Sequence, residues 1–154
     1  MPSEQERREL LLASGVPEEL HHIMGPHGVA PLNRKLGIRM LEMSAEKLVA
    51  TMPVAGNEQN IGILHGGAHF VLAESLGSIA ALLHVYQNLG EAHPAVGTEL
   101  SATHHRSARE GMVTATCTPL NLGRQITSHE IVMRDDDGRR LSTARMTNMI
   151  LRPR

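Results

Sequence analysis

The chain is predicted to be an α+β protein in which a long central helix is wrapped by a curved antiparallel sheet of about five or six strands. Residues 67–86 are apolar almost all round, with apolar positions at three- and four-residue spacing, which is typical of a buried helix. From residue 95 onward apolar and polar residues alternate in runs separated by short turns, which predicts antiparallel strands. Such a helix and sheet bury their apolar faces together only if the sheet curls around the helix.

The other elements follow in chain order. Ser3, with a glutamate at the third helical position and a following apolar run, predicts a capped helix that ends at Gly15; a second helix is expected between Pro17 and Gly25. The runs KLGIRMLEM and KLVATMPV, separated by a polar turn at residues 44–46, predict an opening hairpin. Four strands are then expected at 95–106, 112–120, 125–134 and 140–151, the last two joined by a turn at residues 135–138. We therefore expect an N-terminal helical extension over residues 1–30 and one domain over residues 31–154.

Composition narrows the classes of function. A chain of 154 residues with 41% hydrophobic content can form one domain with a substantial core. A net charge of −1 with mixed signs argues against nucleic acid or a membrane surface as a partner. No apolar run is expected to reach the length of a membrane span, and the polar N-terminus does not resemble a signal peptide, so a cytoplasmic protein is expected. The single Cys117 excludes an intrachain disulfide and is expected to pack inside a strand.

Glu74 is the candidate catalytic carboxylate. It lies in the middle of the apolar helix, where a buried ionised side chain loses hydration that donors or cations must replace, so its presence predicts a function. Gly67, Val71, Glu74 and Ser78 recur at helical spacing. The Ser78 hydroxyl and the carboxylate are therefore expected on one face that leads back to the glycines.

The start of the same helix supplies a second candidate group. Gly66 and Gly67 leave helix-end amides and the positive end of the helix dipole open, which suits a developing oxyanion. His65 and Gln59 lie just upstream, where each can donate to a carbonyl oxygen or hold a water. The ten histidines form no HxxxH motif with an added carboxylate, so no metal and no cofactor is expected.

The stretch 62–78, with LHGGAHFVLAESLGS at its centre, resembles the phenylacetate-type (PaaI-type) hotdog thioesterases. The resemblance is strongest to the dihydroxynaphthoyl-CoA and enterobactin-pathway members of that family. The segments GTEL (97–100), HHRSAREG (104–111) and PLNLGR (119–124) also fit, and the similarity extends over about residues 35–151. It implies the hotdog fold, hydrolysis of an acyl-CoA with an aromatic or bulky acyl group, and a homodimer that assembles into a homotetramer.

The resemblance also implies a role for each matched position. Glu74 resembles the family's carboxylate, which either attacks the thioester or activates water, and both roles stay open. The Gly66 amide resembles the oxyanion donor, with His65 assisting, while Gln59 and Ser78 orient water and carboxylate. The positions expected to contact substrate and coenzyme A are Gly97, His104, His105, Arg106, Ser107, Asn121, Gly123 and Arg124.

Two other functions stay open. One is a non-catalytic hotdog module that binds acyl-CoA, although binding alone does not require a carboxylate that faces the thioester. The other is a hotdog hydratase or dehydratase, which needs a histidine paired with an aspartate or glutamate around the helix start.

Two segments depart from the family pattern. The N-terminal 30 residues, with His21, His22 and His27, have no counterpart in it, and the loop from Val85 to His93 is longer. Both are expected to reshape the entry of the substrate.

Overall fold

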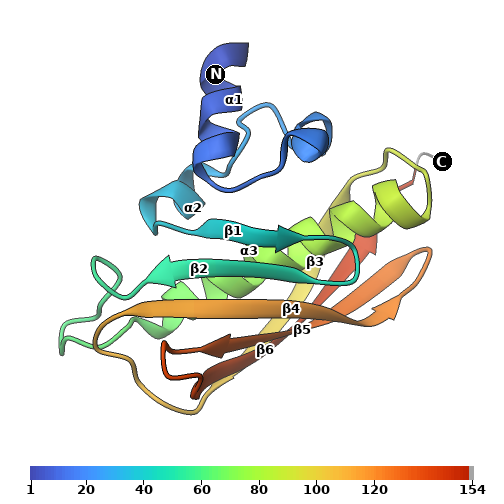
Figure 1. Ribbon diagram of the computed structural model, residues 1–154. Helices are drawn as coiled ribbons and strands as arrows, with labels where there is room; N and C mark the ends of the chain where they lie inside the picture. Colours follow the sequence, from blue (N-terminus) through green and yellow to red (C-terminus); the bar gives the residue numbers. More distant parts are fainter. Residues whose placement is uncertain (153–154) are drawn as a thin grey trace.

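A computed structural model of the protein describes residues 1–152 and shows one antiparallel sheet wrapped around one long helix (Figure 1). The central helix is α3 (Gly66–Leu83), continued by a π-helical turn, η2 (His84–Asn88). The strands are β1 (Arg39–Met43), β2 (Leu48–Pro53), β3 (Ala95–His104), β4 (Met112–Leu122), β5 (Ile126–Arg134) and β6 (Arg140–Ile150). Their spatial order is β1-β2-β4-β5-β6-β3, so β1 and β3 form the two edges. The predicted fold class is confirmed.

The helix α3 packs one face onto the sheet. Its buried face includes Leu72, Leu76 and Leu83, which have no exposed surface, and the sheet contributes Met133 and Met146 to the same core. Full burial of each such side chain stabilises the fold by about 1.5–3 kcal/mol. The helix is therefore apolar because one broad face packs on the sheet, while Glu74 lies on the opposite, outward face.

The stretch Gly66–Asn88 is long and apolar enough, by length and composition, to cross a membrane. The expectation that no apolar run reaches that length is therefore wrong. In the structure 61% of its most apolar window is buried inside the molecule, because the curved sheet surrounds it. The cytoplasmic location stays a prediction.

Strands β2, β5, most of β6 and the first part of β4 alternate between buried and more exposed residues, as predicted, whereas the edge strand β3 has no buried residue and does not alternate. In β5 every second residue is buried, from Thr127 and His129 to Ile131 and Met133. Cys117 of β4 is also buried, as expected, and burial raises the pKa of its thiol to about 12. A thiol that holds its proton so strongly is unsuited to nucleophilic catalysis.

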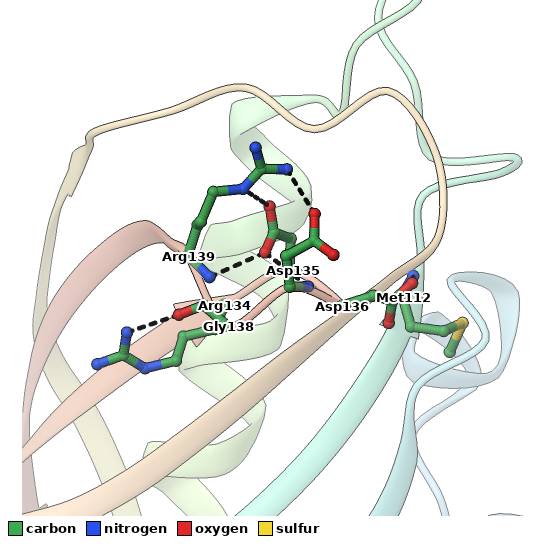
Figure 2. Close-up of polar contacts among 7 residues, drawn as sticks. Met112, Arg134, Asp135, Asp136, Gly138 and Arg139 are labelled. Carbon is green, nitrogen blue, oxygen red and sulfur yellow. Dashed lines mark hydrogen bonds and ion pairs between the residues drawn. The ribbon is translucent and has the colours of Figure 1, made fainter.

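A tight turn joins β5 to β6 and is held by charged side chains (Figure 2). The Asp135 carboxylate accepts hydrogen bonds from the backbone N–H of Arg139 at 2.9 Å and from its guanidinium at 2.8 Å. Asp136 Oδ2 accepts from the Met112 amide at 3.0 Å, which ties the turn to the start of β4. The predicted turn at residues 135–138 is confirmed.

The N-terminal segment, defined here as residues 1–38, packs against the β1 edge. It contains α1 (Glu4–Ala13), the 3₁₀ helix η1 (Glu18–Ile23) and α2 (Pro31–Lys35), and α1 begins with the predicted capping box between Ser3 and Glu6. The Met40 amide of β1 donates to the Ser14 carbonyl at 2.8 Å. Gly15 has a φ of 79°, and a side chain there would overlap the Met40 carbonyl oxygen. The division of the chain at residue 30 stays a prediction.

Candidate active site

Glu74 lies on the outward face of α3 and is exposed to solvent in the single chain. This corrects the expectation of a buried carboxylate. The helix is apolar because one broad face contacts the sheet, while Gly67, Val71, Glu74 and Ser78 follow the opposite face and keep exposed surface. The structure does bring Ser78 and Glu74 together, as predicted, because Ser78 Oγ donates to Glu74 Oε1 over a long 3.5 Å.

Gly97 of β3 packs directly against Glu74. A methyl group added to Gly97 would lie 2.8 Å from Glu74 Oε1 and 2.5 Å from the terminal carbon of Met146. Only glycine leaves space for both neighbours. The structure thus places Gly97 beside the carboxylate, and its contact with coenzyme A stays a prediction.

The start of α3 offers one free amide rather than two. The Gly67 N–H donates to His65 Nδ1 at 2.8 Å, so it is already satisfied. None of the hydrogen bonds within residues 1–152 uses the Gly66 N–H, which stays available for a ligand oxygen. Because Nδ1 of His65 accepts a hydrogen bond, the neutral ring carries its proton on Nε2 and can donate from there.

Gln59 and His65 belong to the loop that leads into α3. The backbone of Gln59 closes a tight turn in this loop. Its backbone N–H donates to the Ile63 carbonyl at 2.8 Å, and its backbone carbonyl accepts from the Gly62 N–H at 2.9 Å. The backbone carbonyl of Asn57 accepts a hydrogen bond from the backbone N–H of His65 at 2.9 Å, which fixes the histidine at the helix start. The two predicted residues therefore lie on one ordered loop.

His104, at the end of β3, contacts the helix start. A methyl group added to Gly66 would lie 2.9 Å from His104 Nε2. The Ser142 hydroxyl donates to the Thr103 carbonyl at 3.2 Å, so its oxygen accepts from His104 Nδ1 at 3.0 Å. This partner, which the sequence did not reveal, leaves Nε2 of the neutral ring as an acceptor beside Gly66.

Seven of the predicted site residues thus form two groups along one helix. The helix-start group contains Gln59, His65, Gly66 and His104, and the mid-helix group contains Glu74, Ser78 and Gly97. Gly66 and Glu74 are eight residues apart, which corresponds to about 12 Å along the axis. Within one chain the two groups cannot contact the same carbonyl.

Comparison with known proteins identifies the family. Residues 61–142 match the model of the thioesterase superfamily. The proofreading thioesterase EntH of Klebsiella pneumoniae is 48% identical over 117 residues, which are 75% of this chain and 82% of that protein. EntH of Cronobacter turicensis is 43% identical over 124 residues, 80% of this chain and 88% of that protein. This chain belongs to the thioesterase superfamily.

Solved structures support the same assignment. A glutamine-to-alanine variant of a thioesterase from Pseudomonas aeruginosa matches with a TM-score of 0.71 at 39% identity, covering 78% of this chain and 85% of that one. A thioesterase from Haemophilus influenzae matches with a TM-score of 0.73 at 32% identity, covering 87% and 89%. The protein is therefore a hotdog-fold acyl-CoA thioesterase, as the resemblance implied.

The residues predicted to contact coenzyme A lie at two ends of this thioesterase. His105, followed by Arg106 and Ser107, is bound to the start of β6, because its amide donates to the Leu141 carbonyl at 2.7 Å. The turn that contains Asn121, Gly123 and Arg124 is bound to the other end of β6, where the Ile150 amide donates to the Gln125 carbonyl at 2.8 Å. Nine residues of strand separate these ends by about 30 Å. One chain cannot bring both sets to one phosphate.

An apolar pocket of about 300 Å³ opens beside the carboxylate of this thioesterase. Glu74, Ser78 and Ile79 line it from α3, while Met24 and Asn33 line it from the N-terminal segment. The sequence did not identify Asn33, because only the packing of α2 onto α3 reveals its position. Among the described residues 1–152, no three histidine, cysteine, aspartate or glutamate side chains form a candidate metal site.

Gly97→Ala is expected to lower the activity of this thioesterase by about 10- to 100-fold. The new methyl group displaces the Glu74 carboxylate, and misplacing a reacting group by about 1 Å can cost 10²-fold. The matched control is Gly25→Ala, because Gly25 has no positive φ and nothing lies within 4 Å of an added methyl group. Thiol release from an acyl-CoA measures both variants, and equal activity of the two would contradict the placement of the carboxylate.

Proposed function

We propose that this thioesterase hydrolyses an acyl-CoA with an aromatic or otherwise bulky acyl group at a site formed by two copies of the chain. The observation that carries the proposal is the 12 Å offset, about two helical turns, between the free Gly66 amide and the exposed Glu74 carboxylate. Two copies of α3 in antiparallel orientation remove this offset, because Glu74 of one copy then faces Gly66 of the other.

The β3 edge supports a second copy as the partner. Among residues 1–152, the ten-residue strand β3 pairs only with β6, so its outer backbone N–H and C=O groups are open to another strand. It lies beside the outward face of α3, where Gly97 contacts Glu74. Val96 of this strand is 41% exposed. Pairing of β3 with its symmetry copy joins two sheets and covers both Glu74 faces; two such dimers form the homotetramer that we propose.

The chemistry assigns one task to each group. The Gly66 N–H, at the positive end of the helix, stabilises the oxyanion that forms when the thioester carbonyl is attacked, and one such donor is worth about 3 kcal/mol. Glu74 either attacks the carbonyl carbon or removes a proton from the attacking water, and Ser78 holds the carboxylate. Nε2–H of His65 donates to the acyl or thiol side, and Gln59 orients water. The products are a free acid and coenzyme A.

A spacing in a related thioesterase supports the roles of Gln59 and Glu74. A thioesterase of Staphylococcus aureus, 26–28% identical to this chain, has been solved with alanine in place of a glutamine and, separately, in place of a glutamate fifteen positions further along. Gln59 and Glu74 are separated by the same fifteen positions. The spacing favours a paired role for the two residues here.

Coenzyme A is then expected to contact more than one copy of the chain. Arg106 and Arg124 are exposed and suited to charge-assisted bonds with phosphates, yet they lie at opposite ends of β6. In an assembly, the strand-end residues His105–Ser107 of one copy and the turn residues Asn121–Arg124 of another can approach one ligand. We propose no nucleic acid, membrane or cofactor as a partner.

A panel of thioesters tests the function directly. Release of thiol from benzoyl-, phenylacetyl- and naphthoyl-type CoA esters is expected, with lower rates for acetyl-CoA. Binding of these esters without thiol release would favour the non-catalytic module. Hydration of an enoyl-CoA would favour the hydratase.

Mixed dimers test the shared site. Glu74→Ala and Gln59→Ala are each expected to be nearly inactive, but co-expression of the two chains with different tags is expected to restore activity. A mixed dimer combines the intact Glu74 of one copy with the intact Gln59 of the other, so it has one complete site. Random pairing makes half of the dimers mixed, which predicts recovery of about a quarter of the parent activity. No recovery in purified mixed dimers would overturn a site formed by two copies.

A further inference from the structure

The pocket beside Glu74 has walls from two parts of the molecule. On one side lies α3, and on the other lies the N-terminal segment with β1. Eight of its twelve lining residues precede residue 61, where the family match begins. The side chains of Met24, Val29, Ile38 and Ile79 make most of the lining apolar. The part of the chain outside the family match therefore shapes the space that the carboxylate faces.

The volume suits the acyl part of a thioester. An apolar cavity of about 150 Å³ binds benzene, and this pocket is about 300 Å³. It thus has room for a substituted ring or a short branched chain whose carbonyl lies at Glu74. The adenine and phosphates of coenzyme A do not fit such a space, so they stay outside it.

Asn33 is, with Ser14, one of two polar residues that the N-terminal segment places in this lining. It is 5% exposed, and Ser75 Oγ lies 2.7 Å from its Oδ1 and 2.7 Å from the Val71 carbonyl. The hydroxyl has one proton for these two acceptors. If the proton goes to Asn33, the carboxamide Nδ2 is left for the pocket. If it goes to Val71, a turned carboxamide donates to Ser75 and leaves its oxygen for the pocket.

One polar atom of Asn33 is therefore without a partner within residues 1–152 in either orientation. Asn33 lines the pocket and is not among the fully buried unpaired side chains, so this free polar atom is accessible to a ligand group that fills the pocket. If Nδ2 of Asn33 is the free atom, the ligand group must accept a hydrogen bond; if Oδ1 is the free atom, the ligand group must donate one. A hydroxyl does both.

The wall that carries Asn33 is held in place before any ligand binds. Arg7 Nη2 donates to the His21 carbonyl of η1 at 2.6 Å, and Arg7 Nε donates to the Gly25 carbonyl at 3.1 Å. These bonds join α1 to η1 and to the chain that follows it. The Ser14 carbonyl is bonded to the Met40 amide of β1. A preformed wall can discriminate between ligands because it does not reshape around each of them.

We propose that Asn33 is a specificity-determining residue that hydrogen-bonds a hydroxyl on an acyl group lying in this pocket. The acyl groups that it favours have an apolar body, aromatic or short aliphatic, with one hydroxyl. This inference rests on the proposed function, because it places the thioester carbonyl at Glu74. Asn33 acts on the choice of acyl group and takes no part in the attack on the carbonyl.

Matched pairs of thioesters test the role of Asn33. Values of kcat/KM are measured for phenylacetyl-CoA and its ring-hydroxylated isomers, and for hexanoyl-CoA and 3-hydroxyhexanoyl-CoA. The parent is expected to prefer at least one hydroxylated ester over its unsubstituted partner by about fivefold or more, the range of one neutral hydrogen bond. Asn33→Leu is expected to bring that ratio close to one by lowering kcat/KM for the hydroxylated ester. Asn33→Asp, which keeps an acceptor, is expected to retain part of the preference.

The control is Gln5→Leu, which removes a carboxamide from an exposed position of the same segment. It is expected to leave the ratio at the parent value. An unchanged ratio in Asn33→Leu, an equal loss for both esters, or a parent without preference would overturn the role of Asn33. A parent that hydrolyses no thioester would overturn the proposed function as well, so the two failures are distinguishable.

A second variant tests whether the acyl group occupies the pocket. Ile79→Trp fills space in the lining and is expected to lower kcat/KM for phenylacetyl-CoA at least tenfold more than kcat/KM for acetyl-CoA, whose methyl group needs little of the pocket. Thermal unfolding of the variant, compared with that of the parent, checks that it folds. Equal rates of parent and variant on both esters would place the acyl group elsewhere and overturn the inference.

Discussion

Glu74→Ala is expected to lower kcat on an aromatic acyl-CoA by about 10²- to 10⁴-fold, which is the usual contribution of a positioned catalytic base. The variant is expected to fold, because Glu74 is exposed in the single chain and an exposed substitution typically changes the free energy of unfolding by less than about 0.5 kcal/mol. Thiol release measures the activity, and thermal unfolding measures the fold. Glu74→Gln is expected to be similarly inactive, because the amide neither attacks nor takes a proton.

The matched control for this prediction is Glu46→Ala. Glu46 is an exposed glutamate in the turn between β1 and β2, remote in sequence from either catalytic group. It is expected to keep parent activity and stability. If purified, folded Glu74→Ala cleaved benzoyl- or naphthoyl-type CoA esters at the parent rate, the assignment of the carboxylate would be wrong.

The fold was predictable because its periodicities are long and uninterrupted. The apolar spacing of residues 67–86 and the alternation after residue 95 each persist over several turns or strands, so local pattern and global fold agree. The order of the strands within the sheet was harder to predict from the sequence. The pairing of β3 with β6, far apart in the chain, follows from the closure of the sheet around α3 and not from any local signal.

The site was predictable where its residues share one helix. Glu74 and Ser78 are neighbours because of their spacing, and this was visible in the sequence. The exposure of Glu74 could not be predicted from the sequence, since an apolar helix can have one face without a packing partner. The contact of Ser142 with His104 and that of Asn33 with Ser75 each join residues more than 35 positions apart, so they depend on strand register and helix packing. The same reason separates the predicted coenzyme A contacts into two distant sets.

Two buried histidines are expected to make the fold sensitive to acid. His69 is 3% exposed and His129 is fully buried. Burial, with the nearby His104, lowers the pKa of His69 to about 4; burial, with the nearby His84, does the same for His129. Both ring nitrogens of His129 lack a hydrogen-bond partner among the residues that the structure describes. The interior therefore holds both rings in the neutral form.

The sign of the effect follows from proton binding. In the unfolded chain a histidine has a pKa near 6.5, so between pH 6.5 and 4 the unfolded state binds more protons than the folded state. Stability is fully present above this window and falls as the pH is lowered through it. From the two pKa values, each histidine is expected to remove about 2 kcal/mol at pH 5. Together they remove about 4 kcal/mol, a large share of the 5–15 kcal/mol typical of a folded domain.

His129→Leu is expected to reduce this acid sensitivity, because the variant has no proton-binding group at that position. Urea unfolding of the parent and the variant at pH 7.5 and pH 5 gives the loss of unfolding free energy for each, and the loss is expected to be smaller in the variant by about 2 kcal/mol. The control is His27→Leu at an exposed position, which is expected to follow the parent. An identical loss in parent and His129→Leu would show that protons binding elsewhere destabilise the fold in acid, and that the buried ring between β4 and β6 is not the group that does so.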